Sequence, residues 1–425
     1  MVKRRVMVFP CGSEIGLEIY RALSTAKEVE LFGASSVEDH GKYVYSNYFG
    51  GLPFTEDNSF PSELNRIIND HKIDYIFPAH DSTLLRLAEE QANGGIACPV
   101  LCSPVETCRL CRSKKATLDL FRGLLPTPHV FNSLNEVIEF PVFLKPDVGQ
   151  GSKGTVLAKS AEECRFYLKR DPSLLVLENL PGTEYTVDCF TDRDGKLVFA
   201  GGRERVRIMN GISVTSRPVH NPLFTEYARL INQKLQLRGV WFYQVKLNTS
   251  GEPALMEIAP RIAGAMGMHR ALGVNFALMS IYDAEGFSVK PLLNNFDVRL
   301  DSALNSRCYF EIRYEHVYID FDDCLIMDDT VNTEAVKFLY QCINRGIGLH
   351  LLTRHAGNLE LTLARHRLTG LFDSVTLLTQ GQLKSNAIKH SESIFIDDSF
   401  AERCDVQESL GIPVFAPDVI ASLLF

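Results

Sequence analysis

Two short apolar runs in the last quarter of the chain end in carboxylates, and they limit how this part can fold. One reads Tyr318-Ile319-Asp320-Phe321-Asp322, and the other reads Ile394-Phe395-Ile396-Asp397-Asp398. Continuous apolar runs of this length are typical of strands buried on both faces of a parallel sheet. Because each run ends in carboxylates, the two together look like one Mg²⁺-dependent site for phosphoryl transfer, although Asp-rich turns are often helix caps or surface loops.

The surrounding segment alternates strand and helix patterns. Strands are expected at His316–Asp320, Leu349–Thr353 and Ser393–Asp397, with helices at Thr333–Arg345 and Leu359–Leu368. Only 23 residues lie between Leu325 and Leu349, and 43 lie between Thr353 and Asp397. Neither gap can hold a large cap domain, so we expect an open site unless another part of the chain covers it.

The N-terminal segment also alternates strands with helices, which predicts a second parallel sheet. The expected strands are residues 2–9, Val29–Ala34 and Ile73–Pro78, and the expected helices are Glu14–Ala26 and Asp81–Gln91. Gly12 and Gly16 lack the full dinucleotide-binding pattern, so a tight turn is favoured over nucleotide binding here.

The middle of the chain has a mixed α+β pattern that extends to about Gly286. Its expected strands are Val142–Lys145, Leu174–Glu178, Glu184–Thr191, Val240–Leu247 and Ala254–Ile258. We therefore predict an α/β multidomain protein, since 425 residues exceed one core. The predicted domains are residues 1–112, 113–290 and 314–425, with a connector at 291–313.

Composition narrows the class of protein. The 44 basic and 52 acidic residues give a net charge of −8, which argues against a nucleic-acid partner. No apolar run approaches the ~18 residues that span a membrane. Eleven cysteines without an export signal indicate free thiols and a cytoplasmic protein. The uneven gaps among Cys98, Cys102, Cys108 and Cys111 favour thiols over a zinc site.

A lysine and a glycine-rich loop follow one strand of the middle region. Lys145 ends an apolar run, and Gly149, Gly151 and Gly154 fall within the next residues. Glycines let backbone N–H groups close over phosphate oxygens, although an ordinary turn can look the same. Further along, Gln244 and Glu257 lie on two strands that could pair antiparallel. Oxygen ligands on adjacent strands suit Mg²⁺.

In order and spacing, these elements resemble the ATP-grasp superfamily, near the carbamoyl-phosphate-synthase-like carboxylate–amine ligases, over residues 1 to about 290. The resemblance implies a Rossmann-like pre-ATP-grasp domain, an α+β ATP-grasp domain, and ATP and Mg²⁺ as cofactors. It implies that Lys114 and Lys145 hold the α- and β-phosphates and that Gln244 and Glu257 bind metal. The resemblance further implies γ-phosphate binding by Arg261, ribose binding by Glu184, an adenine site of Glu178, Asn179 and Leu180, and a phosphate lid of Gly149, Gly151, Ser152 and Gly154. Because arginine forks suit carboxylates or phosphates, Arg203 and Arg261 are also expected to bind substrate, whereas surface charge explains Arg205 and Arg207 equally well.

One position departs from that family. The usual Glu-x-Asn-Pro-Arg is Glu257-Ile258-Ala259-Pro260-Arg261 here, so the amide of one metal ligand is missing. The change is compatible with lower metal occupancy, with one Mg²⁺ in place of two, or with a domain that binds nucleotide without turnover.

The acidic strand ends, a strand ending at Thr353 and the lysine Lys384 together resemble the haloacid-dehalogenase (HAD) superfamily over roughly residues 315–425. The resemblance implies a capless, doubly wound parallel sheet. Asp320 would be the nucleophile and Asp322 the general acid and base, while Thr353 and Lys384 hold the phosphoryl oxygens. Asp397 and Asp398 would bind Mg²⁺ with Asp320 and the backbone carbonyl of Asp322. Cys324 replaces the threonine common in that family.

We therefore expect a bifunctional enzyme: an ATP-dependent carboxylate–amine ligase that works through an acyl phosphate, fused to a Mg²⁺-dependent phosphatase. Its partners would be a small-molecule carboxylate and an amine, or a phosphorylated metabolite, and a homodimer is open. One alternative is a phosphatase whose ATP-grasp domain senses nucleotide or binds substrate. A scaffold with both sites inert is disfavoured because the charged groups of both sets are present.

Overall fold

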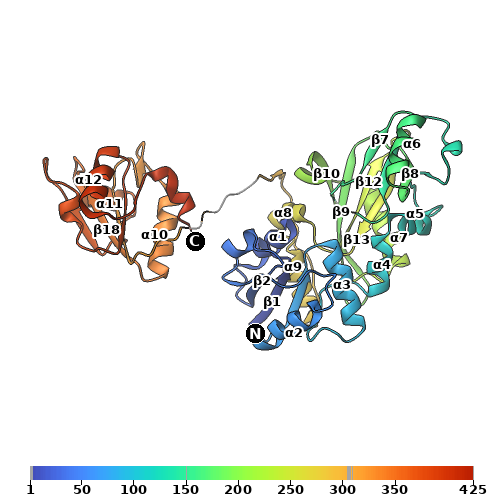
Figure 1. Ribbon diagram of the computed structural model, residues 1–425, viewed down its shortest axis with the longest axis horizontal. Helices are drawn as coiled ribbons and strands as arrows, with labels where there is room; N and C mark the ends of the chain where they lie inside the picture. The colour runs from blue at the N-terminus through green and yellow to red at the C-terminus, as the bar shows by residue number, and fades with distance from the viewer. Residues whose placement is uncertain (1–2, 150, 304–307, 309, 425) are drawn as a thin grey trace. The chain divides into compact units, whose positions relative to one another are not determined.

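The computed structural model describes residues 3–149, 151–303, 308 and 310–424, and it divides into two compact units, residues 1–304 and 305–425 (Figure 1). Gln150 of the predicted phosphate loop, and residues 304–307 and 309 of the predicted connector, lie outside the described residues. None of the helices in the described part combines the length and apolar character that a membrane crossing requires.

A four-stranded parallel sheet begins the first unit, in the order β3-β2-β1-β4. Its strands are β1 (Arg4–Phe9), β2 (Val29–Ala34), β3 (Asn47–Phe49) and β4 (Tyr75–Pro78), and its connections hold α1 (Glu14–Leu23), η1 (His40–Tyr43), α2 (Phe60–His71) and α3 (Asp81–Ala92). The predicted parallel sheet is thus confirmed. The strand order reverses between β1 and β4, and an α/β sheet opens a crevice beside such a reversal.

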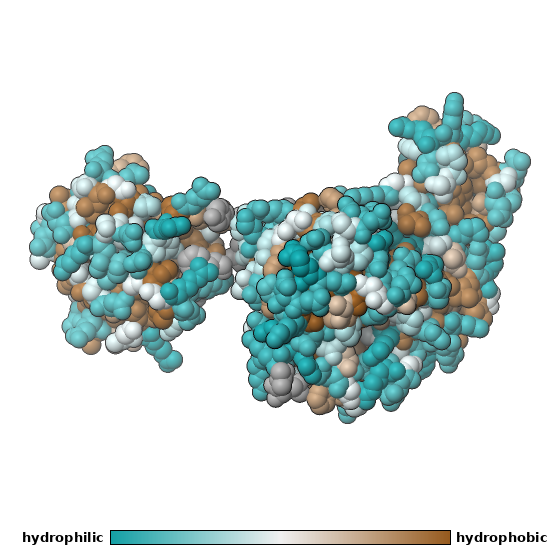
Figure 2. Space-filling view, turned by 60° about the horizontal axis from the view of Figure 1, so that its bottom comes forward, coloured by the Kyte–Doolittle hydropathy of each residue, from teal (hydrophilic) through white to brown (hydrophobic). Residues whose placement is uncertain are grey.

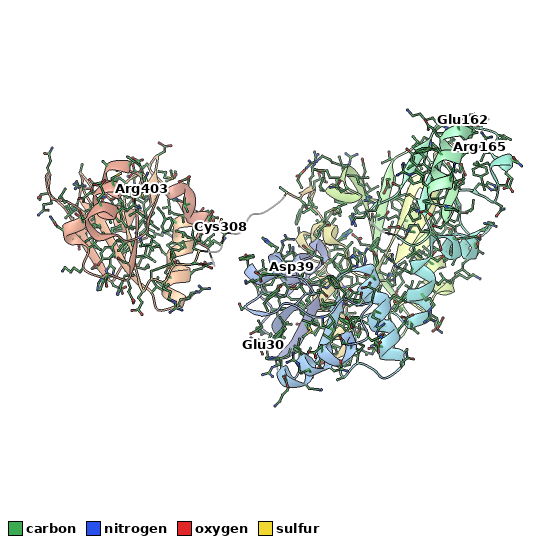
Figure 3. The ribbon with its side chains drawn as sticks, in the orientation of Figure 1. Glu30, Asp39, Glu162, Arg165, Cys308 and Arg403 are labelled. Atoms are coloured by element: carbon green, nitrogen blue, oxygen red, sulfur yellow. The ribbon has the colours of Figure 1, made fainter. Side chains whose placement is uncertain are left out.

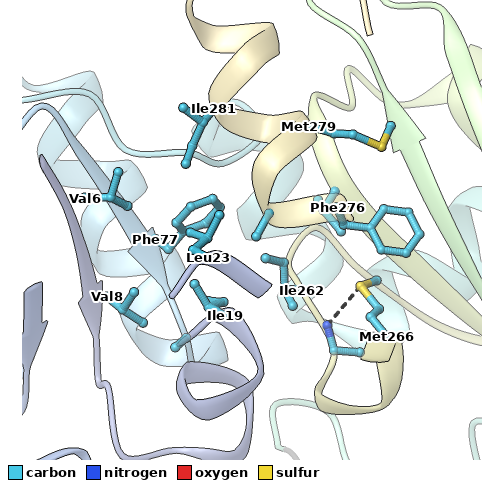
Figure 4. Close-up of a cluster of buried hydrophobic side chains, with 14 of the residues drawn as sticks. Val6, Val8, Ile19, Leu23, Phe77, Ile262, Met266, Phe276, Met279 and Ile281 are labelled. Atoms are coloured by element: carbon cyan, nitrogen blue, oxygen red, sulfur yellow. Dashed lines mark hydrogen bonds between the residues drawn. The ribbon is translucent and has the colours of Figure 1, made fainter. Parts of the chain in front are cut away.

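The core of this sheet includes residues from late in the first unit (Figure 4). Val6 and Val8 of β1 and Ile19 of α1 belong to one buried cluster with Ile262 and Phe276. The late segment holds η3 (Gly264–Met266), α8 (Gly267–Ala271) and α9 (Phe276–Ala284). Burial of this cluster therefore ties the chain after Arg261 to the N-terminal sheet.

Two antiparallel sheets make up the rest of the first unit. The larger has the order β13-β12-β9-β10-β11-β14 and the smaller β5-β8-β6-β7. Their strands are β5 (Val130–Phe131), β6 (Val142–Pro146), β7 (Val156–Ala158), β8 (Leu174–Glu178), β9 (Glu184–Thr191), β10 (Leu197–Met209), β11 (Ile212–Val219), β12 (Gly239–Leu247), β13 (Pro253–Ala259) and β14 (Leu300–Asp301). The helices are α4 (Val105–Arg112), α5 (Lys114–Phe121), η2 (Leu134–Glu136), α6 (Ala161–Arg170) and α7 (Pro222–Lys234). All five predicted strands of this region are present, each within one residue at either end.

The predicted connector at 291–313 is too long at both ends. Leu300–Asp301 forms β14, which pairs with β11 of the first unit. Phe310 and Ile312 pack against the core of the second unit. A two-residue strand is too short to produce a hydrophobic period, so β14 could not be predicted from the sequence.

The second unit is a five-stranded parallel sheet in the order β19-β18-β15-β20-β21. Its strands are β15 (His316–Ile319), β18 (Gly348–Thr353), β19 (Ser374–Leu377), β20 (Ser393–Ile396) and β21 (Val414–Phe415), with a hairpin of β16 (Ile326–Met327) and β17 (Thr330–Val331). Its helices are α10 (Thr333–Asn344), α11 (Leu359–Arg365), η4 (Ser385–Ala387), α12 (Phe400–Leu410) and η5 (Pro417–Ser422). The predicted strands and helices are confirmed, and the strand order reverses between β15 and β20.

The surface and the thiols agree with the sequence analysis. Hydrophilic residues cover most of the face drawn in Figure 2. All eleven cysteines are free, and Cys98, Cys108 and Cys111 are buried. The Cys108 thiol donates to the Ser103 carbonyl at 3.2 Å. The thiol interpretation of the cysteine cluster stays a prediction.

Candidate active sites

A cavity of about 720 Å³ lies in the first unit and collects side chains from both of its halves. Glu14 and Asp81 line it from the segments after β1 and β4, where the strand order reverses. Gln244, Glu257 and Arg261 line it from β12, β13 and the turn after β13. We call this space the main cavity.

A smaller hollow of about 150 Å³, the side pocket, shares part of its lining with the main cavity. Its apolar wall includes Phe143 and Met256, and the polar residues predicted for a nucleotide also line it. These are Lys114, Lys145, Gly149, Gly151, Ser152, Glu178, Asn179, Leu180, Glu184, Gln244 and Glu257. Of the residues predicted for nucleotide binding, Gly154 is not among the residues that line either space.

The predicted metal ligands face one another. Gln244 of β12 is the register partner of Glu257 of β13, as the strand patterns predicted. Beside them, the Lys145 ammonium donates to the Met256 carbonyl at 3.4 Å. Burial lowers the pKa of Lys145 to about 8, although Glu257 acts in the opposite direction. Two oxygen ligands and a poorly neutralised lysine form a site suited to a metal-bound anion.

Lys114 is fixed at the start of the glycine-rich loop. It begins α5, where the Ser113 hydroxyl accepts from the Ala116 N–H as the helix cap. The Lys114 ammonium donates to the carbonyls of Asp147 and Gly149 at 3.3 and 3.1 Å. Its charge therefore lies beside the loop that was predicted to bind phosphate.

The loop also touches the turn between β10 and β11. Gly211 has φ +76, and a Cβ atom at this position would lie 2.3 Å from the carbonyl carbon of Gly151. Any larger residue would be strained and would force one of the two segments to move. The turn and the glycine-rich loop thus meet backbone to backbone.

Arg205 was assigned no role from the sequence, yet it lies at the centre of the site. Its Nη1 donates to Glu184 Oε1 at 2.6 Å and to Gln244 Oε1 at 2.8 Å. Its Nη2 donates to the Gly211 carbonyl at 2.6 Å. Burial lowers the pKa of Arg205, and Glu184 opposes this change. Arg205 therefore joins the predicted ribose residue to a predicted metal ligand.

The strand geometry explains why this arginine was missed. The register of β10 against β11 shifts between Arg205 and Arg207, which marks a bulge. A bulge disturbs the strict alternation on which a sequence prediction of buried and exposed residues depends. Arg205 is buried, whereas the side chain of Arg207 is 52% exposed and pairs with Asp301.

The two arginines that were predicted to bind substrate have carboxylate partners in the protein. Arg203 donates to Asp188 at 2.8 and 3.3 Å, and His269 Nδ1 lies 3.0 Å from the same carboxylate. Arg261 donates to both oxygens of Asp81, at 2.6 and 2.8 Å. Both arginines line the main cavity. They are therefore held rigidly and partly neutralised.

The candidate site of the second unit lies where its strand order reverses. Asp320 follows β15, and Asp397 follows the adjacent β20. The Lys384 ammonium lies 3.0 Å from Asp320 Oδ1 and 2.5 Å from Asp397 Oδ2. Thr353 ends β18 and is buried. The structure thus brings together four of the residues predicted from the sequence.

The charged groups of this cluster counteract the effect of burial on one another's pKa values. Burial raises the pKa of Asp320, and burial raises that of Asp397 to about 6, while Lys384 acts against both changes. Burial also acts to lower the pKa of Lys384, but Asp320 and Asp397 outweigh it and the net change is upward. The lysine therefore stays charged between two carboxylates.

Several polar atoms in this cluster have room for a further partner. The Thr353 hydroxyl is buried without a hydrogen bond of ordinary geometry. Asp320, Cys324 and Asp398 each place one potential ligand atom within 4.8 Å of the others. Arg403 of α12, labelled in Figure 3, donates to the carbonyls of Asp397 and Asp398 at 2.5 and 2.7 Å and so fixes this turn. A cation that prefers oxygen ligands fits the carboxylates of Asp320 and Asp398, and the Cys324 thiol is the least suitable of the three potential ligands.

Asp322 faces a different neighbour. Both of its carboxylate oxygens lie 3.0 Å from His355 Nδ1, and its side chain is 50% exposed. The contact of His355 with Asp322 could not be inferred from the spacing of the two residues in the sequence. Asp322 thus lies at the solvent side, where a general acid and base would have to act.

Comparison with known proteins supports one part of the sequence analysis. Residues 170–301 match the family described as "ATP-grasp in the biosynthetic pathway with Ter operon". No sequence among the curated proteins matches the chain. Lys114 and Lys145 lie outside the matched segment, so their assignment depends on the geometry described above.

Similar solved structures share the fold at low sequence identity. The Rhizobium etli pyruvate carboxylase variant T882A, with acetyl coenzyme-A, matches at TM-score 0.55 and 16% identity, over 68% of this chain and 29% of that chain. The biotin carboxylase domain of the Hydrogenobacter thermophilus 2-oxoglutarate carboxylase, complexed with MgADP, ADP and bicarbonate, matches at 0.55 and 15%, over 71% and 73%.

The L-amino acid ligase of Bacillus licheniformis matches at TM-score 0.52 and 17% identity, over 68% of this chain and 75% of that chain. Together with the matched segment, these structures support an ATP-grasp fold in the first unit.

Proposed function

Starting from an ATP-grasp fold, we propose that the first unit is an ATP-dependent ligase that converts a small-molecule carboxylate to an acyl phosphate for attack by an amine or another nucleophile. The observation that carries the proposal is the pairing of Gln244 with Glu257 beside the buried Lys145. The neighbouring structures titled as carboxylases and as an amino acid ligase support the same class of chemistry.

The two spaces divide the work of this site. The adenosine of ATP would occupy the side pocket, between Glu178, Asn179 and Leu180 and the apolar wall. The phosphates would extend past Lys145 and the glycine-rich loop toward the main cavity. Gln244 and Glu257 would hold Mg²⁺, which neutralises phosphate charge during transfer. The acceptor carboxylate would lie in the main cavity, near Arg203 and Arg261.

Lys145 is suited to this role because its charge is poorly neutralised by the protein. Burial of an ammonium is costly unless an anion accompanies it. A bound phosphate would provide that anion and would raise the lysine pKa again. The protein contributes position and charge, which are the main contributions to phosphoryl transfer.

For the second unit we propose a Mg²⁺-dependent phosphatase of the HAD type. Asp320 would attack phosphorus and form an aspartyl phosphate, with the leaving group protonated by Asp322. Asp322 would then take a proton from the water that hydrolyses this intermediate. Lys384 and Thr353 would hold the phosphoryl oxygens. Asp320 and Asp398, together with Asp397, would hold Mg²⁺, which offsets the charge that gathers at the phosphoryl group.

A second candidate function for the first unit is nucleotide binding without turnover. Ala259 supplies no metal ligand, and the bidentate pair with Asp81 occupies the Arg261 guanidinium. Both observations favour a unit that senses ATP or presents substrate to the phosphatase.

One experiment separates these functions. The full chain is incubated with ATP, Mg²⁺ and pooled carboxylates and amines, while ADP and free phosphate are followed separately. ADP that appears only with a particular acceptor pair supports the ligase. ATP binding without ADP under every acceptor mixture supports the nucleotide-binding alternative. Hydrolysis of an aryl phosphate in the same preparation tests the phosphatase independently.

A further inference from the structure

Three histidines from separate segments of the second unit converge away from the phosphatase cluster. His316 begins β15, His350 lies within the adjacent β18, and His390 precedes β20 on the other side of β15. Each places a ring nitrogen within 4.8 Å of the nitrogens of the other two. Asp320 follows the opposite end of β15, about 13 Å along the strand at ~3.3 Å per residue.

Two of the ring nitrogens face each other directly. His316 Nδ1 lies 3.0 Å from His350 Nε2. Two ligands at ~2.0–2.1 Å from one metal ion are about 2.9 Å apart at a right angle and about 3.4 Å apart in a tetrahedron. The observed separation lies within that range. The His390 ring stacks on the His316 ring with centroids 3.6 Å apart, so the third imidazole lies directly beside the first.

The backbone leaves space beside these two nitrogens. At Gly348, an added Cβ would lie 2.5 Å from His316 Nδ1 and 3.3 Å from His350 Nε2. The absence of a side chain at Gly348 therefore lets the two ring nitrogens lie close to the backbone and to each other.

His350 and His390 each place one further ring nitrogen beside a hydroxyl oxygen. His350 Nδ1 lies 2.8 Å from Ser374 Oγ, and His390 Nδ1 lies 2.7 Å from the Tyr318 hydroxyl. Histidines that bind metals usually donate their second N–H to an oxygen, which fixes the ring orientation and the tautomer.

We propose that His316, His350 and His390 form a binding site for a divalent transition metal ion such as Zn²⁺, separate from the phosphatase centre. Three imidazoles suit Zn²⁺, Ni²⁺ or Cu²⁺ rather than Mg²⁺, which prefers oxygen ligands. The ion would join β18, β15 and β20 at the edge opposite the phosphatase cluster and stabilise the folded unit by mass action.

The test uses the full chain with Mg²⁺ in excess, which occupies sites made of oxygen ligands. Co²⁺ is added as a spectroscopic probe, and Zn²⁺ is then used to displace it. One equivalent of Co²⁺ with visible d–d absorption, lost on addition of Zn²⁺, is expected. His390→Ala, at an exposed position, should weaken Co²⁺ binding at least ~100-fold, and Tyr318→Phe should weaken it about 10-fold.

Two controls separate this site from others. His220→Ala removes an exposed histidine of the first unit and should leave the absorption unchanged. Asp320→Asn removes a proposed Mg²⁺ ligand and should also retain it. The proposal is overturned if wild-type protein gives no d–d absorption, or if the absorption survives in His390→Ala. It is overturned as well if Asp320→Asn abolishes the signal.

Discussion

The two candidate active sites each contain a buried lysine, but the protein treats the two charges in opposite ways. Burial lowers the pKa of Lys145 in the first unit to about 8. In the second unit burial also acts to lower the pKa of Lys384, yet Asp320 and Asp397 outweigh it and raise the value. The difference lies in the partners. Among the described residues, Lys145 donates to a carbonyl at 3.4 Å, whereas Lys384 has two carboxylates within 3.0 Å.

This comparison teaches what each site lacks. Lys145 lies in a low-dielectric place with incomplete neutralisation, so the first site gains most from an incoming anion such as a phosphate. The second site already balances its lysine with two carboxylates and gains most from an added cation. In the first site, a phosphate would neutralise the charge of Lys145. In the second site, a phosphate would bind together with a metal ion.

The largest expected effect tests the second site. Asp320→Asn should lower hydrolysis of an aryl phosphate by ~10³-fold or more, because an amide cannot form the covalent intermediate and is a weaker metal ligand. Steady-state kinetics with an activated aryl phosphate measure it. Asp322→Asn should cost less with such a good leaving group. Equal losses in the two variants would contradict the assigned roles.

The next effect tests the first site. Lys145→Met should lower ADP formation by about 100-fold or more and weaken ATP binding, because the proposed phosphate contact is lost. Glu257→Ala should likewise abolish ADP formation through the metal. Aryl-phosphate hydrolysis serves as the internal control and should be unchanged in both variants. A loss of both activities would show that the sites are not independent.

The same lysine should affect stability in the opposite direction. Its folded pKa of about 8 lies below the ordinary lysine value of 10.5, so the unfolded state binds more protons between these values. At neutral pH this costs the folded state on the order of 3 kcal/mol. Lys145→Met should therefore raise the unfolding free energy without nucleotide.

This stability difference should depend on pH in a defined direction. As the pH rises from about 8 to 10.5, the destabilisation of the wild-type protein by Lys145 disappears. The difference in unfolding free energy between Lys145→Met and the wild type therefore becomes smaller. Denaturant unfolding at several pH values measures it. A variant less stable than the wild type at neutral pH would mean that Lys145 is already neutralised.

A smaller effect is expected at two arginines of one strand. Arg205→Met should weaken ATP binding or ADP formation by about 10-fold, because Glu184 and Gln244 lose their shared donor. Arg207→Met is the matched control, since that exposed side chain pairs only at the surface. Calorimetric titration of ATP with Mg²⁺ measures both. Similar behaviour of the two variants would remove Arg205 from the site.

The smallest effect concerns the missing amide. Ala259→Asn restores the residue usual in ATP-grasp ligases at this position and should lower the Mg²⁺ concentration for half-maximal ADP formation by a few-fold. Ala259→Ser, with a shorter side chain, is the control. No change in Mg²⁺ dependence with Asn would indicate that Arg205 already supplies the positive charge needed beside Gln244.

Sequence patterns predicted those parts of the molecule that depend on local order. The pairing of Gln244 with Glu257 was expected from two strands that could pair antiparallel, and the meeting of Asp320 with Asp397 was expected because each ends a buried apolar run. Both predictions depend on the hydrophobic period and the direction of the strands, which can be inferred from a single sequence.

The parts that the sequence could not predict depend on register and distant contacts. Arg205 lies next to a bulge that breaks the alternation of β10. The three histidines come from positions 316, 350 and 390, and no pattern in their spacing indicates that β15, β18 and β20 bring them together. Strand order is decided by packing of the whole sheet, so such clusters appear only when the fold is known.

The pair between Asp81 and Arg261 has a consequence for recombination. Its two members are 180 positions apart, one at the start of α3 and the other after β13. Removing one member of a largely buried ion pair typically costs 3–5 kcal/mol. A chimera that took its first hundred residues from a relative would therefore need an acid at position 81, or a neutral residue at 261. A substitution at position 81 or 261 is therefore expected to be tolerated only together with a matching substitution at the other position.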